Sequence, residues 1–212
     1  MSKPRQVRVP VFYDFSSTIC YFTHRVLERL APELDKLGID LDWSPIDLVG
    51  ITAWRRGEPF GPERTQNLER LSRELDVPVA TPSHWMDSRE AMAVAIDLAA
   101  ADRANEASRN GDEQRWRAAV WSWVYQDART LDQPGALEAI AQRAGIAVTP
   151  PGPRAIEEVE RRTVVAHAAG VRGVPTFLLD AWPVGIGIQE DDTMLDFLRR
   201  FAATKREDPG PN

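Results

Sequence analysis

The sequence contains one cysteine, Cys20, so the chain cannot form an internal disulfide. Histidine is almost as scarce, with three residues, and no two of them have the spacing of metal ligands, so we expect no metal site. Basic side chains are outnumbered, because 26 Lys and Arg stand against 32 Asp and Glu, for a formal net charge of −6. Nucleic-acid-binding proteins need a basic face and anionic membranes attract basic segments, so we expect neither partner.

Long apolar runs are also missing. No stretch of the sequence approaches the roughly 18–20 apolar residues of a membrane-spanning helix. The N-terminal residues carry charges, but the apolar segment that follows, residues 9–15, is short and includes Asp14, which is not typical of a signal peptide. We therefore expect a cytoplasmic protein. Glycine motifs for phosphate or dinucleotide binding are absent as well, so no nucleotide is expected.

The first part of the chain has the pattern of a strand, a helix and a second strand. Residues 8–15 are rich in β-branched and aromatic side chains, which favours a strand. Apolar residues then recur with helical spacing, although Pro32 is expected to kink or break this helix and Gly38 to cap its end. Residues 39–45 alternate between apolar and polar side chains, as in a strand. This order predicts two parallel strands joined by a helix.

The middle of the chain, residues 54–150, has little strand signal. Its apolar residues recur with helical spacing in four segments separated by breaks that contain proline or glycine. These predicted helices cover residues 63–75, 88–109, 113–131 and 135–144. We interpret the whole segment as an all-helical insertion. An aromatic cluster is its expected core: Trp116, Trp121, Trp123 and Tyr125.

After a proline-rich break, the last part of the chain returns to a mixed pattern. Residues 154–169 read as a helix, residues 176–180 as a strand and residues 184–188 as its partner strand. A last helix begins near Glu190, where acidic residues suit the helix dipole. The polar tail, residues 205–212, contains two prolines and is expected to be disordered.

Two motifs stand in a characteristic order, with the helical stretch between them. The first is Asp-Phe-Ser-Ser-Thr-Ile-Cys-Tyr at residues 14–21, and the second is Gly-Val-Pro-Thr-Phe at residues 173–177. In this order the chain resembles the DsbA-like branch of the thioredoxin superfamily. That branch includes the FrnE-like cytoplasmic oxidoreductases, the 2-hydroxychromene-2-carboxylate isomerases and the kappa-class glutathione transferases. The segment Gly187-Ile188-Gln189 looks most like that of the FrnE-like group.

The resemblance covers nearly the whole chain and implies its domain organisation. The implied fold is α/β, a thioredoxin-like fold with an inserted all-helical domain, as in DsbA. Residues 1–53 and 151–204 would form the thioredoxin-like domain, and residues 54–150 would form the insertion. Since isomerase and transferase relatives are often dimers, the resemblance also allows a homodimer.

The first motif supplies the candidate catalytic residues, Ser17 and Cys20. In the family this motif holds Cys-x-x-Cys in the oxidoreductases, or a serine at the first position in the isomerase and transferase groups. A serine cannot form a disulfide, but its hydroxyl can donate a hydrogen bond to a thiolate, and the N-terminus of a helix favours an anion. Ser17 therefore implies a thiol from a bound ligand, and glutathione is the candidate co-substrate. Ser17 is also a candidate N-cap of the helix, although Ser16 fits that role too.

The second motif is similar to the cis-proline loop of the family. A cis bond between Val174 and Pro175 would leave the N–H and C=O of Val174 facing the site. These groups would pair with an extended peptide, or with the cysteinyl part of glutathione, as an added strand does. Val174 and Pro175 are thus expected to bind glutathione together with Ser17.

Three functions remain open from the sequence. The first is a glutathione-dependent isomerase or transferase with an unidentified second substrate that enters from the helical domain. Against it, these relatives usually carry Ser-Pro-Tyr-Ser where this chain has Ser-Thr-Ile-Cys. The second is a cytoplasmic disulfide oxidoreductase or isomerase that acts on a thiol substrate through Cys20 alone. The third is a non-catalytic protein that binds a peptide or small molecule in the same cleft.

Several residues near the motifs have a plain structural interpretation beside the functional one. Cys20 by itself is often only a small buried apolar residue. His24, one helical turn beyond it, would either raise the thiolate fraction of Cys20 or simply face solvent. The side chains of Trp54, Trp85 and Trp182 would either line a cleft between the two domains or pack in the core.

Overall fold

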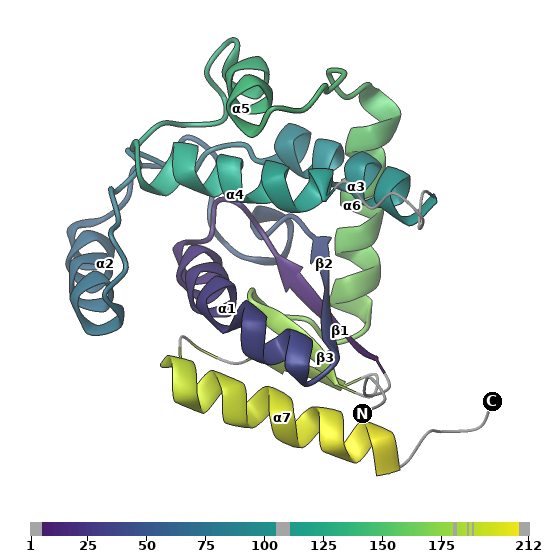
Figure 1. Cartoon of the computed structure of the whole chain (residues 1–212). Helices are drawn as coiled ribbons and strands as arrows, with labels where there is room; N and C mark the ends of the chain where they lie inside the picture. The colour runs from purple at the N-terminus through teal and green to yellow at the C-terminus, as the bar shows by residue number, and fades with distance from the viewer. Residues whose placement is uncertain (1–5, 105–110, 180–181, 186, 188, 208–212) are drawn as a thin grey trace.

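The structure, a computed structural model, describes residues 6–104, 111–179, 182–185, 187 and 189–207 (Figure 1). In chain order its elements are β1 (Val7–Tyr13), α1 (Thr18–Lys36), β2 (Ile39–Pro45), the short helix η1 (Val49–Ile51), α2 (Pro62–Leu75), α3 (Arg89–Ala104), α4 (Asp112–Tyr125), α5 (Ala136–Ala144), α6 (Pro153–Ala168), β3 (Thr176–Leu179), β4 (Trp182–Gly185) and α7 (Asp191–Glu207). Among these described elements, no helix combines the length and the apolar character that crossing a membrane requires.

The strands form one mixed sheet in the order β2-β1-β3-β4. The first two strands are parallel, with Val7 opposite Ile39 and Tyr13 opposite Pro45, so the predicted parallel pair is confirmed. Strand β3 runs antiparallel to β1, and β4 runs antiparallel to β3. Parallel neighbouring strands need a crossover connection, and α1 provides it. Gly38 adopts a positive φ of 63°, which lets the chain leave α1 and enter β2 directly.

One face of the sheet packs against α1 and α7 (Figure 1). The apolar core on this face is formed by Val7, Val9, Val11, Val26, Leu27, Leu30, Leu34, Ile39, Phe177, Met194, Leu198, Phe201 and Ala202. Arg29 of α1 and Asp191 of α7 add a two-pronged ion pair at 2.9 and 2.5 Å. We expected Pro32 to kink or break this helix; α1 is not broken there and continues to Lys36. The buried Leu30 and Leu34 on either side of the proline hold the last turn against the sheet.

Helices α2, α3, α4 and α5 all come from the segment between β2 and α6, and α3 and α4 pack against each other above the sheet (Figure 1). Their apolar side chains form one core that also contains Tyr13 at the end of β1 and Cys20, Tyr21 and Phe22 of α1. Because this core includes residues of the first motif, the helical segment covers the start of α1.

One helix of this segment ends earlier than the sequence predicts. The helix predicted over 113–131 stops at Tyr125. Beyond it Ala128 adopts a positive φ of 53°, and the Trp123 indole donates a hydrogen bond to the Thr130 carbonyl at 3.1 Å. The chain therefore folds back against the helix that it has just left.

Other predicted boundaries shift by a few residues or fall partly outside the description. The strand predicted over 184–188 is β4, Trp182–Gly185, because β3 pairs its Leu179 with Trp182. Residues 186 and 188 lie outside the described residues, as do residues 105–109 of the helix predicted over 88–109.

The C-terminal helix is longer than expected. The predicted disordered tail starts at residue 205, but α7 continues to Glu207, since the first helix-breaking residue is Pro209. The rest of the predicted tail, residues 208–212, lies outside the described residues.

Candidate functional site

Ser17 forms the N-cap of α1, directly after the turn that follows β1. Its backbone is extended, with φ −86° and ψ 111°, and its Oγ accepts the backbone N–H of Cys20 at 3.3 Å. The N–H groups of Thr18 and Ile19 find no acceptor among the described residues, as is usual in the first turn of a helix. No acidic residue lies in that first turn, so the positive end of the helix dipole has no carboxylate of its own turn beside it.

Cys20 lies one turn into α1 and is fully buried in the core beneath the helical segment. Burial raises the pKa of its thiol to about 12. The Ser17 hydroxyl and the backbone of Asp14 lower this pKa, but their combined effect is smaller than that of burial. At neutral pH Cys20 is therefore a protonated thiol, which is neither a nucleophile nor a ready partner for disulfide exchange.

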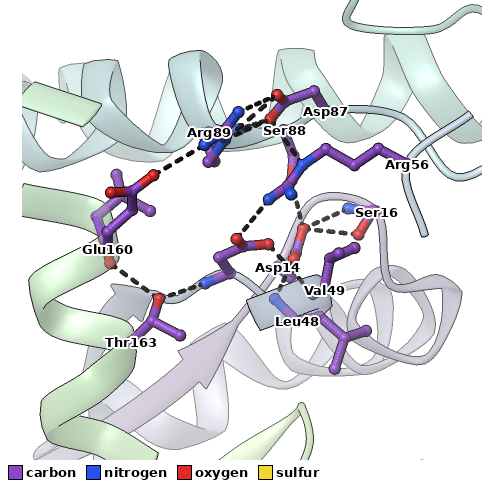
Figure 2. Close-up of polar contacts among 12 residues, drawn as sticks. Asp14, Ser16, Leu48, Val49, Arg56, Asp87, Ser88, Arg89, Glu160 and Thr163 are labelled. Atoms are coloured by element: carbon purple, nitrogen blue, oxygen red, sulfur yellow. Dashed lines mark hydrogen bonds and ion pairs between the residues drawn. The ribbon is translucent and has the colours of Figure 1, made fainter. Parts of the chain in front are cut away.

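Asp14 is the polar anchor of the motif, a role that the sequence alone did not reveal. Its buried carboxylate accepts four hydrogen bonds (Figure 2): Ser16 N at 2.7 Å, Ser16 Oγ at 2.9 Å, Leu48 N at 2.6 Å and Ser88 Oγ at 2.7 Å. Burial raises the pKa of Asp14, while these bonds lower it to a smaller extent. Because Ser16 is fully used by Asp14, the helix cap is left to Ser17. Strand β1 accordingly ends at Tyr13, although the predicted strand ran to Phe15.

A chain of ion pairs that begins at Asp47 lies beside this anchor (Figure 2). Asp47, after β2, pairs with Arg56, and Arg56 lies 3.3 Å from Asp87 before α3. Asp87 in turn pairs with Arg89 at 2.7 Å, and Arg89 reaches Glu160 of α6 at 2.8 Å. The loop after β2, the start of α3 and the middle of α6 are thereby connected close to the first motif.

The second motif borders a cavity of about 440 Å³. The cavity is lined by Ile19, residues 170–176, Pro183, Gly185 and Gly187. The Val174–Pro175 peptide bond is cis, and the N–H and C=O of Val174 make no hydrogen bond to another described residue. Backbone groups of this kind can pair with an extended ligand as an added strand does. The structure thus brings the predicted loop next to the N-terminus of α1.

Ser17 itself does not line this cavity. Its exposed fraction is 3%, whereas Ile19, two residues further along α1, faces the cavity. The predicted residues therefore fall into two groups. Val174 and Pro175 line the cavity, whereas Ser17 and Cys20 are buried and do not line it.

Arg64 of α2 is a second residue that the sequence did not single out. Its guanidinium donates to the Thr18 hydroxyl at 3.0 Å and to the Ser16 carbonyl at 3.4 Å. A basic residue 46 positions away from Thr18 carries no sequence signal of this contact. Through Arg64 the helical segment places a positive charge at the rim of the first motif.

The remaining candidates have structural surroundings. His24 is 3% exposed, against the expectation of a solvent-facing histidine, and burial lowers its pKa to about 4. Its ring packs on Trp121 with ring centres 4.4 Å apart. Trp54 and Trp85 stack on each other, with ring centres 4.1 Å apart, while Trp182 on β4 is 75% exposed. Among the described residues, no group of three or more His, Cys, Asp or Glu side chains is arranged to hold a metal ion.

Comparison with known proteins adds to this geometry. A family model described as DSBA-like thioredoxin domain matches residues 8–199. No curated protein matches the sequence at a significant level.

Solved structures resemble this one over nearly the whole chain. A 2-hydroxychromene-2-carboxylate isomerase has 17% identity and a TM-score of 0.63, covering 97% of this chain and 100% of its own. A probable DsbA oxidoreductase from Streptomyces coelicolor has 18% identity and a TM-score of 0.66, covering 97% and 92%. The cytosolic disulfide reductase DsbM from Pseudomonas aeruginosa, solved with GSH, has 18% identity and a TM-score of 0.55, covering 92% and 98%. At these identities the likeness is one of fold.

Proposed function

The chain belongs to the DSBA-like thioredoxin domain family, and from that premise we propose that it is a glutathione-dependent enzyme of thiol chemistry. Glutathione binds along the Val174–Pro175 loop, and its thiolate is held at the N-terminus of α1 by the Ser17 hydroxyl. The bound thiolate is the nucleophile that attacks a second substrate. The reacting sulfur is thus brought by the ligand, because the chain has a serine where the oxidoreductases of the family have their first cysteine.

The observation that carries this proposal is the burial of Cys20, the one cysteine of the chain. Cys20 is fully buried and has a pKa raised to about 12 by that burial, so it is a poor candidate for the reacting thiol. This argues against the alternative of a single-thiol oxidoreductase. A protein with this fold but no reactive thiol of its own needs a thiol from elsewhere to perform the family's chemistry.

The first turn of α1 suits a sulfur anion. The N–H groups of Thr18 and Ile19 are unpaired among the described residues and point out of the helix end, where the dipole favours negative charge. The Ser17 hydroxyl already lowers the pKa of the neighbouring Cys20 thiol, so its O–H is placed to stabilise a thiolate. A ligand sulfur that reaches this helix end from the cavity at Ile19 would accept a hydrogen bond from the Ser17 O–H.

The loop at Val174 supports the placement of the peptide part of glutathione. The free N–H and C=O of Val174 border the 440 Å³ cavity, which has room for a short extended peptide. One similar structure is that of a cytosolic disulfide reductase with GSH. We propose the same ligand and the same compartment for this chain.

Glutathione binding, measured by titration calorimetry, tests the proposal. We expect the wild type to bind reduced glutathione and Ser17→Ala to bind it about 10- to 100-fold more weakly, the value of a hydrogen bond to a charged group. Ser122→Ala, which removes a serine hydroxyl from α4, serves as the matched control and should bind like the wild type. Circular dichroism of Ser17→Ala checks that loss of the cap, worth about 1 kcal/mol, has not unfolded the helix. Absence of binding to the wild type at millimolar glutathione would favour a non-catalytic protein.

A further inference from the structure

A second cavity lies between α1, α4 and α5. Its volume is about 450 Å³. Residues of these three helices line it together with Gln126, and α4 packs against both of the other helices (Figure 1). It shares no lining residue with the cavity at the Val174 loop. A hollow of this size between helices is typical of sites that bind small molecules.

The charged side chains around this cavity have one sign. Each of the three helices contributes one arginine to the lining: Arg25, Arg115 and Arg143. No aspartate or glutamate of the described residues lines it. His24 also lines the cavity, but burial lowers its pKa to about 4, so it is neutral at neutral pH. Three positive charges thus gather at one hollow in a chain whose net charge is −6, and such a hollow attracts anions.

Arg25 of α1 presents an open edge. Its guanidinium donates to Glu28 through Nη1 alone, at 2.7 Å. The Nε and Nη2 atoms of Arg25 make no hydrogen bond to another described residue, and neither nitrogen is buried. These two nitrogens form the edge with which arginine binds phosphate and carboxylate oxygens in a two-pronged manner. A ligand in the cavity can therefore pair with Arg25 without displacing Glu28.

Arg115 and Arg143 are exposed and also keep unused donors. Nη2 of Arg115 pairs with Asp112, while its Nε and Nη1 have no partner among the described residues. Arg143 donates through Nη2 to Asp127 at 2.6 Å and through Nη1 to Ser122 at 3.3 Å, which leaves its Nε unpaired within the described chain. Both carboxylates lie outside the lining, so these ion pairs hold the arginines in place without filling the cavity.

The uncharged part of the lining is small or aromatic. Ala118 and Ala119 of α4 and Ala144 at the end of α5 contribute only methyl groups, so space remains between the helices. The rings of Tyr21 and Trp121 are buried and provide apolar surface. The cavity thus combines a place for an anionic group with a place for an organic body.

We propose that this cavity binds a small organic phosphate. A phosphate monoester carries close to two negative charges at neutral pH and three strong acceptor oxygens, so several guanidinium groups can bind it at once. A carboxylate has one charge and two oxygens, which a single arginine satisfies. The organic part of the ligand lies against the alanines and the rings. The inference does not rest on the proposed function, because Ser17 and the Val174 loop lie outside this lining.

Titration calorimetry with phenyl phosphate tests the inference on the full chain. We expect saturable binding, and at least about tenfold weaker binding of benzoate, which has the same ring but a single charge. Arg25→Gln should bind phenyl phosphate at least about tenfold more weakly than the wild type, because it lacks the open edge. Arg70→Gln is the matched control, since Arg70 of α2 is exposed and pairs with Glu74 but does not line the cavity. Its affinity should equal that of the wild type.

Three results of this titration would overturn the inference. The first is no binding of phenyl phosphate to the wild type. The second is equal affinities of Arg25→Gln and Arg70→Gln. The third is benzoate that binds as tightly as phenyl phosphate, because the cavity would then not select a phosphate.

A pair of substitutions at Ala118 tests the charge of the cavity with all three arginines in place. Ala118 is half-buried and lines the cavity from α4. Ala118→Asp adds a carboxylate to the lining, and Ala118→Asn adds a side chain of the same size without charge. We expect Ala118→Asp to bind phenyl phosphate at least about tenfold more weakly than Ala118→Asn, since the added carboxylate repels the ligand and competes for the arginines. Equal affinities of the two variants would mean that positive charge does not hold the ligand, and the inference would fall.

Discussion

In the first motif, Ser17 and Cys20 are one helical turn apart but lie in different environments. The Ser17 hydroxyl caps the N-terminus of α1, where two backbone N–H groups are unpaired among the described residues. The Cys20 thiol points into the core formed by the end of β1 and the helical segment. A thiolate in that core would lose its hydration without gaining a cation, which is why burial has the largest effect on its pKa.

The reactivity of Cys20 follows from this pKa. A pKa of about 12 leaves roughly one thiol in ten thousand ionised at about pH 8, against about a quarter for an ordinary thiol. We therefore predict that iodoacetamide labels Cys20 in the folded protein at least about a hundredfold more slowly than in the urea-unfolded chain, and that the rate rises with pH up to about 12. Mass spectrometry of timed samples measures both rates. Fast labelling of the folded protein near neutral pH would restore Cys20 as a candidate reacting thiol.

The sequence predicted these site residues unevenly. Ser17, Cys20, Val174 and Pro175 were visible because each belongs to a short motif. The partners that position the first motif were not visible, because Asp14 meets Ser88 across 74 positions and no local pattern predicts such a pairing. The same limit applies to Arg64, whose contact with Thr18 depends on how α2 packs.

At the level of elements, polar contacts connect the strand ends to the helical segment. The Asp47 side chain is 6% exposed and forms an ion pair with Arg56. The backbone N–H of Asp47 donates a hydrogen bond to the Thr163 hydroxyl of α6 at 2.8 Å. Gly50 packs so closely here that an added Cβ would lie 3.2 Å from Thr163. The loop after β2 is thereby fixed between the sheet and α6, close to the Leu48 N–H that binds Asp14.

Removal of Arg56 should loosen this connection. Arg56→Met leaves the buried Asp47 carboxylate without its cation, and we predict a loss of about 2–4 kcal/mol in the free energy of unfolding, since breaking one side of a buried ion pair is strongly destabilising. Urea denaturation followed by circular dichroism measures the loss. Arg55→Met, at the adjacent exposed position, should change stability by less than about 0.5 kcal/mol. Equal effects of the two substitutions would mean that the ion-pair chain does not anchor the loop.

Element types were predictable from the sequence, and some element ends were not. The alternation at residues 39–45 predicted β2 with the bounds that the structure has. The end of α4 was missed because the apolar pattern continues past Tyr125 to Leu131, which packs in the same core from a loop. The spacing of apolar residues indicates which side chains are buried. It does not distinguish a continuous helix from a segment that folds back along the helix before it.

For the molecule as a whole, the helical segment is not an independent layer above the sheet. Its core continues into Tyr13, Phe15 and Cys20 at the start of the thioredoxin-like part, so both parts of the chain enclose the first motif. The cavity at the Val174 loop borders the start of α1 at Ile19. Under the proposed function, a reaction between a bound thiol and a second substrate would take place at this end of α1.

The ionisation state of glutathione in the complex shows whether Ser17 holds a ligand thiolate. Thiolates absorb in the ultraviolet and thiols do not, and Cys20 contributes no thiolate near neutral pH because of its raised pKa. We predict that glutathione added to the wild type at about pH 7 produces a thiolate band, and that Ser17→Ala, saturated with glutathione, shows a much weaker band. Glutathione that binds as a neutral thiol, or a thiolate band of equal strength in Ser17→Ala, would contradict the claim that Ser17 holds a ligand thiolate.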